Sequence, residues 1–300
     1  MTYFHVYDEN DKCLGRRWRE LKRTLEGKVA LVTGGSRGAG RGIAVELGKA
    51  GAKVYVSGRS LRGAATRDYP GSVDETAEEI FAAGGTAYAC RCDHTNDEET
   101  KALIEKIRHE QGRLDILVNN VWGGHDLGVD VQPRPFWEYP LKMWETMFQG
   151  GVRAQLATNY YAIPLMLEND SGLIVHTTFW DEDKYLSSFY YDLAKNSLNR
   201  MAFGLAQDLR DTGITVVAVS PGWMRTELVL ASFRTDEDHW REVEALNRTE
   251  SPYYVGRAVC ALANDGRIGH KNGQVMQVGE LAKEYGFTDI DGRLIPPFRI

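Results

Sequence analysis

The stretch KVALVTGGSRGAGRG, residues 28–42, decides the fold. Its first part, residues 28–33, is a short β-rich run that passes directly into a turn containing Gly34, Gly38 and Gly40. A strand, a glycine-rich turn and a helix in this order are typical of the first unit of a parallel α/β sheet. The glycines let the backbone turn tightly and approach a pyrophosphate at the positive N-terminus of the following helix. A glycine-rich turn that holds no ligand is the alternative at this point.

Six further β-rich runs follow, and longer amphipathic stretches separate them. The seven runs are KVALVT (28–33), KVYVS (53–57), TAYACRC (86–92), LDILVNN (114–120), GLIVHTT (172–178), GITVVAVS (213–220) and QVMQVG (274–279). Strands that alternate with helices predict a doubly wound (Rossmann) α/β fold, with about seven parallel strands and helices on both faces. Because the chain has no repeat, low-complexity tract or long linker, we expect one domain at 27–300 after an N-terminal extension at 1–26.

Composition narrows the class of protein. The chain has 300 residues, 43% of them hydrophobic and 26% charged, with a net charge of −6. These values are typical of a globular protein, and the negative charge argues against nucleic acid as a partner. No run approaches the ~20 apolar residues of a membrane span, and the start MTYFHVYDENDK is polar, so we expect a cytoplasmic protein. The four cysteines, at 13, 90, 92 and 260, form no CxxC pair, so we expect neither a metal site nor disulfides.

The second strand ends in YVSGRS, residues 55–60, where a doubly wound sheet binds its ligand. An NAD site would offer an acid here, but Gly58 and Arg59 occupy these positions. Arg59 can stack on adenine and clamp a 2′-phosphate, and Arg37 of the glycine turn can close on the same phosphate. The sequence therefore predicts NADP(H) in preference to NAD(H). A solvated basic rim is the alternative.

Several motifs occur in an order that identifies a family. They are TGGSRGAG (33–40), VNN (118–120), a strand that ends in the hydroxyl of Thr178, Tyr191-x-x-x-Lys195, and PGWMRT (221–226). With these motifs the chain resembles the single-domain short-chain dehydrogenase/reductase family over about residues 27–280. FWEYPLKMW (136–144) and LAKEYGFTDIDGR (281–293) resemble the branch that contains dehydrogenase/reductase family member one.

Helical geometry selects between two adjacent tyrosines. Residues four apart share a helix face, so Tyr191 faces Lys195 and Tyr190 does not. A nearby ammonium and a nicotinamide's positive charge would favour the phenolate and lower the pKa of Tyr191. The resemblance implies that Lys195 also holds the nicotinamide ribose, that Tyr191 gives its proton to the substrate oxygen, and that Thr178, a serine in most relatives, hydrogen-bonds the developing alkoxide. The alternative is a core tyrosine beside a surface lysine.

One residue that the resemblance implies is missing. The family's asparagine, which helps to hold a water chain to the lysine, aligns with Gly151 in FQGGVRA. The paired glycines at 150–151 weaken a helix and could leave carbonyls free to bind water directly. Close helix packing is the equally weighted alternative.

The resemblance assigns further cofactor contacts, which complete the set Gly34, Ser36, Arg37, Gly38, Gly40, Arg59, Asp93, Asn119, Tyr191, Lys195, Pro221, Gly222 and Thr226. It implies that Asp93 meets the adenine amino group, although Asp93 could equally cap the helix that begins near Asn96. It also implies that Asn119 lines the cofactor ribose and that Thr226 meets the carboxamide.

Large rings gather after the strand ends on the nicotinamide side, where a substrate would lie. They are Trp122, Phe179, Trp180 and Trp223. Such walls suit apolar, planar substrates, although each ring could instead pack under a lid or at a subunit contact. Two insertions modify the plan: residues 61–75 carry Arg62 and Arg67, which could reinforce the phosphate site or merely decorate a loop, and residues 224–250 match a substrate lid.

These observations predict an NADP(H)-dependent oxidoreductase that interconverts a carbonyl and an alcohol on an apolar, aromatic or polycyclic small molecule. Two alternatives remain open: a catalytically silent NADP(H)-binding sensor or scaffold, and another redox step such as C=C reduction. The resemblance also implies a homodimer or homotetramer that pairs through the helix containing 141–168.

Overall fold

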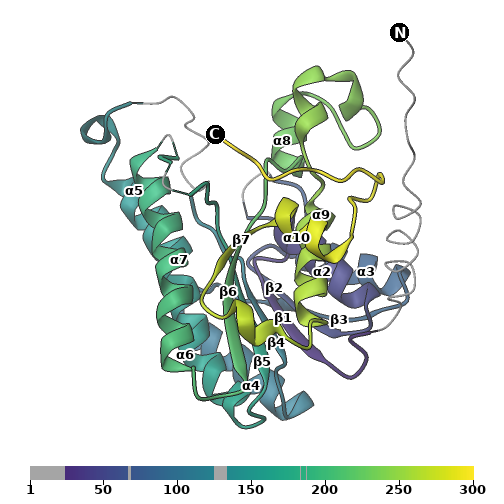
Figure 1. Cartoon of the computed structure of the whole chain (residues 1–300), viewed down its shortest axis with the longest axis vertical. Coiled ribbons are helices and arrows are strands. Elements are labelled where there is room, and N and C mark those ends of the chain that lie inside the picture. The colour runs from purple at the N-terminus through teal and green to yellow at the C-terminus, as the bar shows by residue number, and fades with distance from the viewer. Residues whose placement is uncertain (1–23, 67–68, 125–133, 183, 187) are drawn as a thin grey trace.

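A seven-stranded parallel sheet forms the centre of the molecule (Figure 1). The computed structural model describes residues 24–66, 69–124, 134–182, 184–186 and 188–300. The strands are β1 (Val29–Thr33), β2 (Lys53–Gly58), β3 (Thr86–Arg91), β4 (Ile116–Asn119), β5 (Gly172–Thr177), β6 (Ile214–Ser220) and β7 (Val275–Gln277). All seven predicted strands are present, and the predicted doubly wound fold is confirmed.

The strand order, β3-β2-β1-β4-β5-β6-β7, creates the crevice in which the site lies. The chain winds outward in opposite directions from β1 and β4, so the loops after these two neighbouring strands diverge and leave a gap. The central strands are buried on both faces, which explains their nearly continuous runs of valine, leucine and isoleucine.

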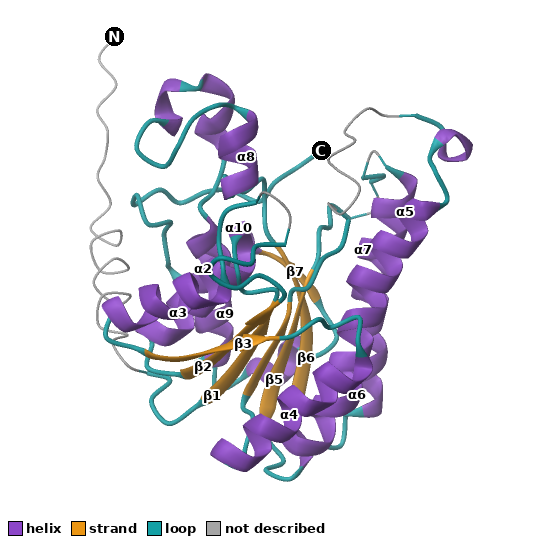
Figure 2. Ribbon diagram, turned by 180° about the vertical axis from the view of Figure 1, so that it is seen from behind, coloured by secondary structure: helices purple, strands orange, loops and turns teal. Residues whose placement is uncertain are grey.

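Helices cover both faces of the sheet (Figure 2). The α-helices of the described residues are α2 (Gly38–Lys49), α3 (Val73–Ala82), α4 (Asp97–Gln111), α5 (Lys142–Trp144), α6 (Ala154–Leu167), α7 (Phe189–Asp208), α8 (Glu227–Ser232), α9 (Pro252–Ala263) and α10 (Val278–Tyr285). α2, α3 and α9 form one layer, and α4, α6 and α7 form the other. A π-helical segment, Glu145–Arg153, joins α5 to α6 without a break.

Local signals fix where two of these helices begin. Ser72 caps α3 through a reciprocal pair of hydrogen bonds with Glu75, so the end of the 61–75 insertion forms the start of a helix. The side chain of Asn96 caps α4 by accepting hydrogen bonds from the N–H groups of the first turn. The alternative that Asp93 caps this helix is therefore wrong, and Asp93 instead accepts a hydrogen bond from the N–H of Thr95.

Two segments lie outside the regular alternation of strands and helices: the expected lid and the N-terminal extension. Residues 224–250, expected as a lid, contain α8 and two 3-10 turns, Trp240–Glu242 and Glu244–Arg248, and rise above the sheet (Figure 1). Leu25 is buried in the core although we assigned it to the extension; the rest of that extension, residues 1–23, lies outside the described residues.

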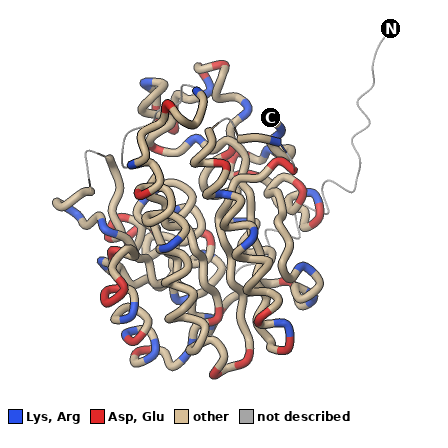
Figure 3. Tube along the Cα trace, turned by 90° about the vertical axis from the view of Figure 1, so that its left-hand side faces the viewer, with Lys and Arg blue, Asp and Glu red and all other residues tan. Residues whose placement is uncertain are grey.

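The surface carries acidic and basic residues intermixed on the face that Figure 3 presents. Within the described ranges, no helix is long and apolar enough to cross a membrane. The same ranges contain no cluster of three or more metal-ligating side chains.

Candidate active site

A cavity of about 1090 Å³ opens at the carboxyl edge of the sheet, between the loops that follow β1 and β4. Most of the residues singled out in the sequence line this cavity, although they come from seven segments of the chain. They are Gly34, Ser36, Arg37, Gly38, Arg59, Asp93, Trp122, Thr178, Phe179, Tyr191, Lys195, Pro221, Gly222, Trp223 and Thr226. Gly40, Asn119 and Trp180 are not part of its wall.

The glycine turn forms one end of the cavity, and its glycines are required by close contacts. Gly34 and Gly38 have φ values of +63° and +53°, which disfavour any residue with a side chain. A Cβ at Gly40 would lie 2.2 Å from the carbonyl oxygen of Gly34, so Gly40 packs inside the turn and lets it close. The N-terminus of α2 consequently opens into the cavity at Gly38, with a favourable dipole for an anion.

Arg37 does not point freely toward the cavity. Its guanidinium donates hydrogen bonds to the carbonyls of Pro70 and Gly71, at 2.8 and 2.9 Å, and to the hydroxyl of Ser60, at 3.0 Å. Arg37 therefore holds the 61–75 insertion against the glycine turn, and Arg59 from the end of β2 lines the adjacent wall.

The other arginines of the insertion do not join this wall. Arg62 pairs with Glu78 on the surface and accordingly lies outside the cavity, as the alternative interpretation allowed. Arg67 lies outside the described residues.

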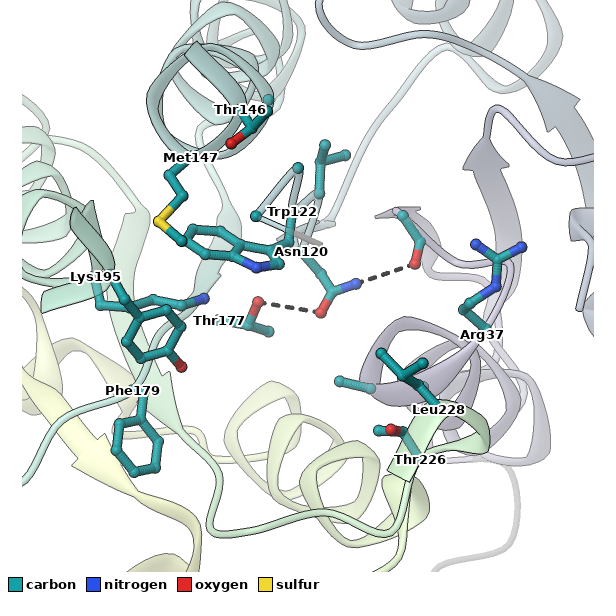
Figure 4. A pocket seen from close by; sticks show the side chains of 18 of the residues that line it. Arg37, Asn120, Trp122, Thr146, Met147, Thr177, Phe179, Lys195, Thr226 and Leu228 are labelled. Carbon is teal, nitrogen blue, oxygen red and sulfur yellow. Dashed lines mark hydrogen bonds between the residues drawn. The ribbon is translucent and has the colours of Figure 1, made fainter. Parts of the chain in front are cut away.

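The expectation that Asn119 lines the cofactor site is wrong. Asn120, the next residue in the chain, faces the cavity instead. Asn119 is buried, and its amide donates a hydrogen bond to Asn159 at 2.8 Å. Asn120 follows it in the chain and turns the other way, as successive residues of a strand do. Its amide donates to the carbonyl of Gly34 at 3.1 Å, and its oxygen accepts from Thr177 at 3.1 Å (Figure 4). Asn120 thus ties the ends of β4 and β5 to the glycine turn.

Tyr191 and Lys195 lie together in the wall opposite the glycine turn. They are one helical turn apart on α7, and the Lys195 ammonium lies 5.6 Å from the Tyr191 ring centroid. Tyr190 is instead buried with Tyr139 and Met143 and does not line the cavity.

Burial acts on both ionisable groups of this pair. It lowers the pKa of the Lys195 ammonium to about 7 and raises the pKa of Tyr191 above its usual value of 10.0. The direction for Tyr191 is opposite to the sequence expectation, because the removal of the phenol from water outweighs the field of the ammonium.

Thr178 lies in the cavity wall at the end of β5, but its hydroxyl already has an acceptor. The Oγ donates to the backbone carbonyl of Lys195 at 3.1 Å. This hydrogen bond joins the segment after β5 to α7 and therefore keeps Tyr191 and Lys195 close to the carboxyl end of that strand.

Gly150 and Gly151 allow close packing of the loop after β4. A Cβ at Gly150 would lie 2.9 Å from the Cα of Gly123, and a Cβ at Gly151 would lie 2.8 Å from the ring of Trp122. The packing alternative therefore describes this segment, and Trp122 occupies the space beside Gly151.

The apolar wall contains rings that were expected and others that were not. Phe179 and Trp223 line the cavity, whereas the backbone N–H of Trp180 bonds to Ser220 and its ring is not in the wall; that expectation is wrong. Further apolar lining residues are Tyr139, Met143, Met147, Leu186, Phe298 and Ile300.

Phe298 reaches the wall because the C-terminal segment folds back over the strand ends. Its ring lies 5.6 Å from that of Phe179. Arg299 pairs at 2.9 Å with Asp181, which is buried, and this pair holds the segment in place. The only sequence signal was an acidic residue directly after the two rings that follow β5, and nothing in the sequence indicates its partner 118 positions away.

The lid contacts the glycine turn. Thr226, expected at the carboxamide, lies against Gly38, since a Cβ on that glycine would be 3.4 Å from the Thr226 methyl group. The Glu227 carboxylate accepts a hydrogen bond of 2.8 Å from the N–H of Gly38. A carboxylate of the lid thus occupies the positive end of α2.

Comparison with known proteins agrees with this geometry. Residues 28–237 match the family model described as short chain dehydrogenase. The mouse protein named "Dehydrogenase/reductase SDR family member 1" is 35% identical over 91% of this chain and 87% of its own length. The 7alpha-hydroxysteroid dehydrogenase of Escherichia coli K12 is 29% identical over 80% of this chain and 88% of its own length.

Solved structures agree as well. A short chain dehydrogenase from Mycobacterium thermoresistibile superposes with a TM-score of 0.77 at 27% identity, covering 91% of this chain and 92% of its own. The hydroxysteroid dehydrogenase from Escherichia coli gives a TM-score of 0.69 at 28% identity, covering 86% and 97% of the two chains. The chain therefore belongs to the short-chain dehydrogenase family.

Proposed function

We propose that this protein is an NADP(H)-dependent oxidoreductase that interconverts a carbonyl and an alcohol on an apolar small molecule. One observation carries the proposal: Tyr191 and Lys195 share a single cavity with the glycine turn and the positive end of α2. An acid–base group and a phosphate-binding turn in one cavity are what hydride transfer to a carbonyl requires.

The cavity wall fits the nicotinamide cofactor that the family implies. Gly34, Gly38 and the N-terminus of α2 would hold the pyrophosphate, because the backbone turns too tightly there for side chains to intervene. Asp93 would meet the adenine, and Lys195 the nicotinamide ribose. When bound, the cofactor supplies or accepts the hydride.

The chain's own residues manage the proton. Tyr191 lies in the wall with its phenol protonated, since burial raises its pKa, and so it can donate a proton to a carbonyl oxygen. Lys195 stands one turn away and stabilises the phenolate that remains. Thr178 contributes a donor to the same oxygen after its hydroxyl rotates away from the Lys195 carbonyl.

The preference for NADP(H) is supported by the end of β2. Arg59 lines the cavity together with Ser60 and with Thr66 and Tyr69 of the insertion that Arg37 holds. No carboxylate follows β2 directly to accept ribose hydroxyls, and an arginine there matches the charge of a 2′-phosphate.

The apolar rings support a substrate with a large hydrophobic body. Phe179 lies beside Tyr191, and Met147, Trp223 and Phe298 line the same cavity. The hydroxysteroid dehydrogenases among the relatives have polycyclic substrates in their names, which supports an aromatic or polycyclic carbonyl compound for this chain as well.

The first test compares two adjacent phenols. Tyr191→Phe should lower kcat for NADPH-dependent reduction of polycyclic and aromatic ketones by roughly 10²- to 10⁴-fold, because the proton donor is lost. NADPH binding should persist. Tyr190→Phe, which removes a buried hydroxyl outside the cavity, is the matched control and should retain activity.

Product analysis distinguishes carbonyl reduction from the two alternative functions. Binding of NADPH without turnover of any carbonyl or alkene would indicate a silent sensor or scaffold. Reduction of a C=C bond alone would assign a different redox step to the same cavity.

The cofactor preference is tested at the end of β2. Arg59→Ala should weaken NADPH binding by about 10- to 100-fold, as expected for the loss of a charge-assisted hydrogen bond of about 1.5–3 kcal/mol, and should leave NADH binding nearly unchanged. Arg62→Ala removes an arginine that pairs with Glu78 outside the cavity, so its NADPH affinity should be unaltered. Equal weakening of both cofactors by Arg59→Ala would contradict the assignment.

The contact between the lid and the glycine turn predicts a variant that binds NADPH more tightly, whereas Arg59→Ala should bind it more weakly. Glu227→Gln should tighten NADPH binding by about 2- to 5-fold, because it removes a negative charge that competes for the N-terminus of α2, where one charge is worth about 0.3–1 kcal/mol. Fluorescence titration measures the affinity, and Glu244→Gln, at an exposed lid position, is the control. Weaker binding in Glu227→Gln would show that the carboxylate does not compete.

The proposed homodimer or homotetramer is supported by an apolar stripe on α6. Leu156 and Tyr160, one turn apart, are 51% and 74% exposed, and Phe203 of α7 is also exposed. The double variant Leu156→Glu and Tyr160→Glu should therefore sediment as a monomer, whereas Phe81→Glu on α3 should not change the mass. An unchanged mass in the double variant would place the contact elsewhere.

A further inference from the structure

Trp122 lies directly on the ammonium group of Lys195. The Lys195 Nζ is 4.0 Å from the centroid of the Trp122 ring, a distance at which an ammonium and an indole face attract strongly. The same indole forms an edge-to-face pair with the Tyr191 ring, with centroids 5.6 Å apart and planes at 87°. Figure 4 shows the Lys195 side chain ending beside the labelled indole. One ring therefore contacts both members of the proton-transfer pair.

Two glycines, Gly124 and Gly151, leave the space that the indole of Trp122 occupies. A Cβ at Gly151 would lie 2.8 Å from two ring carbons of Trp122, and a Cβ at Gly124 would lie 2.5 Å from three of its ring atoms. Real Cβ atoms do not approach this closely, so both positions must be glycine for the ring to stay where it is. The ring is thus held on both sides by the backbone.

The ammonium depends on the ring because of what surrounds it. In the part of the chain that the structure describes, no carboxylate pairs with the Lys195 Nζ and no hydrogen bond to it is present. The titratable group in contact with it is Tyr191, and Thr178 from the end of β5 bonds to the Lys195 backbone instead. An ammonium without a carboxylate partner gains from another source of negative potential, and the indole face supplies one.

We propose that Trp122 is a positioning residue, which holds the Lys195 ammonium on its indole face and the Tyr191 ring in an edge-to-face pair. Gly151 is the residue that makes this possible, since the indole fills the volume that any side chain at 151 would need. The inference rests on the proposed function, because it assigns Trp122 a role toward the proton-transfer pair.

The first experiment measures the ammonium without requiring turnover. The protein is labelled with acetic anhydride between pH 5 and 10, and acetylation of Lys195 is followed by peptide mass spectrometry. In Trp122→Leu the midpoint should fall by about 0.5 to 1.5 pH units, the equivalent of a lost cation–π contact. Trp122→Phe keeps a smaller ring and should give an intermediate midpoint. Trp137→Leu, at a position that is 73% exposed and outside the cavity, should match the native protein.

The direction of the shift decides the outcome. An unchanged midpoint in Trp122→Leu would overturn the proposal, and a higher midpoint would do so too, because it would mean that the ring only excludes water. The labelling does not depend on catalysis, so a protein that is inactive toward every carbonyl compound can still show the predicted fall. Failure of the proposed function and failure of this inference are therefore distinguishable.

The second experiment tests whether the indole of Trp122 occupies the volume that a side chain at position 151 would need. It uses two backgrounds, so the result does not depend on the folding of one variant. Gly151→Asn should lower kcat/KM at least 10-fold in the native background, because its Cβ meets the indole, whereas adding it to Trp122→Gly should have less than a 3-fold effect. Equal losses in the two backgrounds would overturn the assignment of this space to the indole. Circular dichroism of each variant reports whether the fold is retained, and the Lys195 midpoint is read on the Trp122→Phe variant if Trp122→Leu does not fold.

Discussion

The site depends on a lysine ammonium that lines the cavity and has no carboxylate partner among the described residues. Lys195 is buried on α7, and burial alone lowers its pKa to about 7, so its charge must be supported by its neighbours. The indole of Trp122 and the ring of Tyr191 face it, and Thr178 fixes the backbone at the same residue. The loop after β4, the end of β5 and one face of α7 consequently meet at this one side chain.

The doubly wound topology brings these three segments together. β4 and β5 are neighbours in the sheet, and both end at the edge where the cavity opens. Asn120 and Thr177 link the two strand ends by a hydrogen bond, and Asn120 continues to the glycine turn after β1. A short polar chain across the sheet edge therefore connects the glycine turn to the end of β5, where Thr178 bonds to the backbone of α7.

The sequence predicted the strands and most of the cavity wall because these depend on periodicity and on position at strand ends. The seven β-rich runs became seven strands, and the choice of Tyr191 over Tyr190 followed from helical spacing alone. Predictions failed where the chain leaves regular structure. Asn119 and Trp180 each stand next to a residue that does line the cavity, so an error of one position separates a residue in the wall from a residue outside it.

Contacts between distant segments were harder still to predict. Arg37 bonds to an insertion more than 20 residues away, and Phe298 enters the wall through a pair between Arg299 and Asp181. Each of these contacts joins charged or polar groups that any surface position could carry, so neither composition nor spacing marks them. Only the fold, by returning the chain to the same edge, makes them neighbours.

The exchange of sizes at positions 122 and 151 shows why a motif should be read with its surroundings. Gly151 replaces an expected polar side chain, and taken alone this loss suggests a defective site. Beside it, the indole of Trp122 fills the volume that a side chain at position 151 would need. A site can therefore lose a hydrogen-bonding group and keep a stabilised ammonium, provided that the space is taken by a group with negative potential, which an indole face supplies and an aliphatic side chain does not.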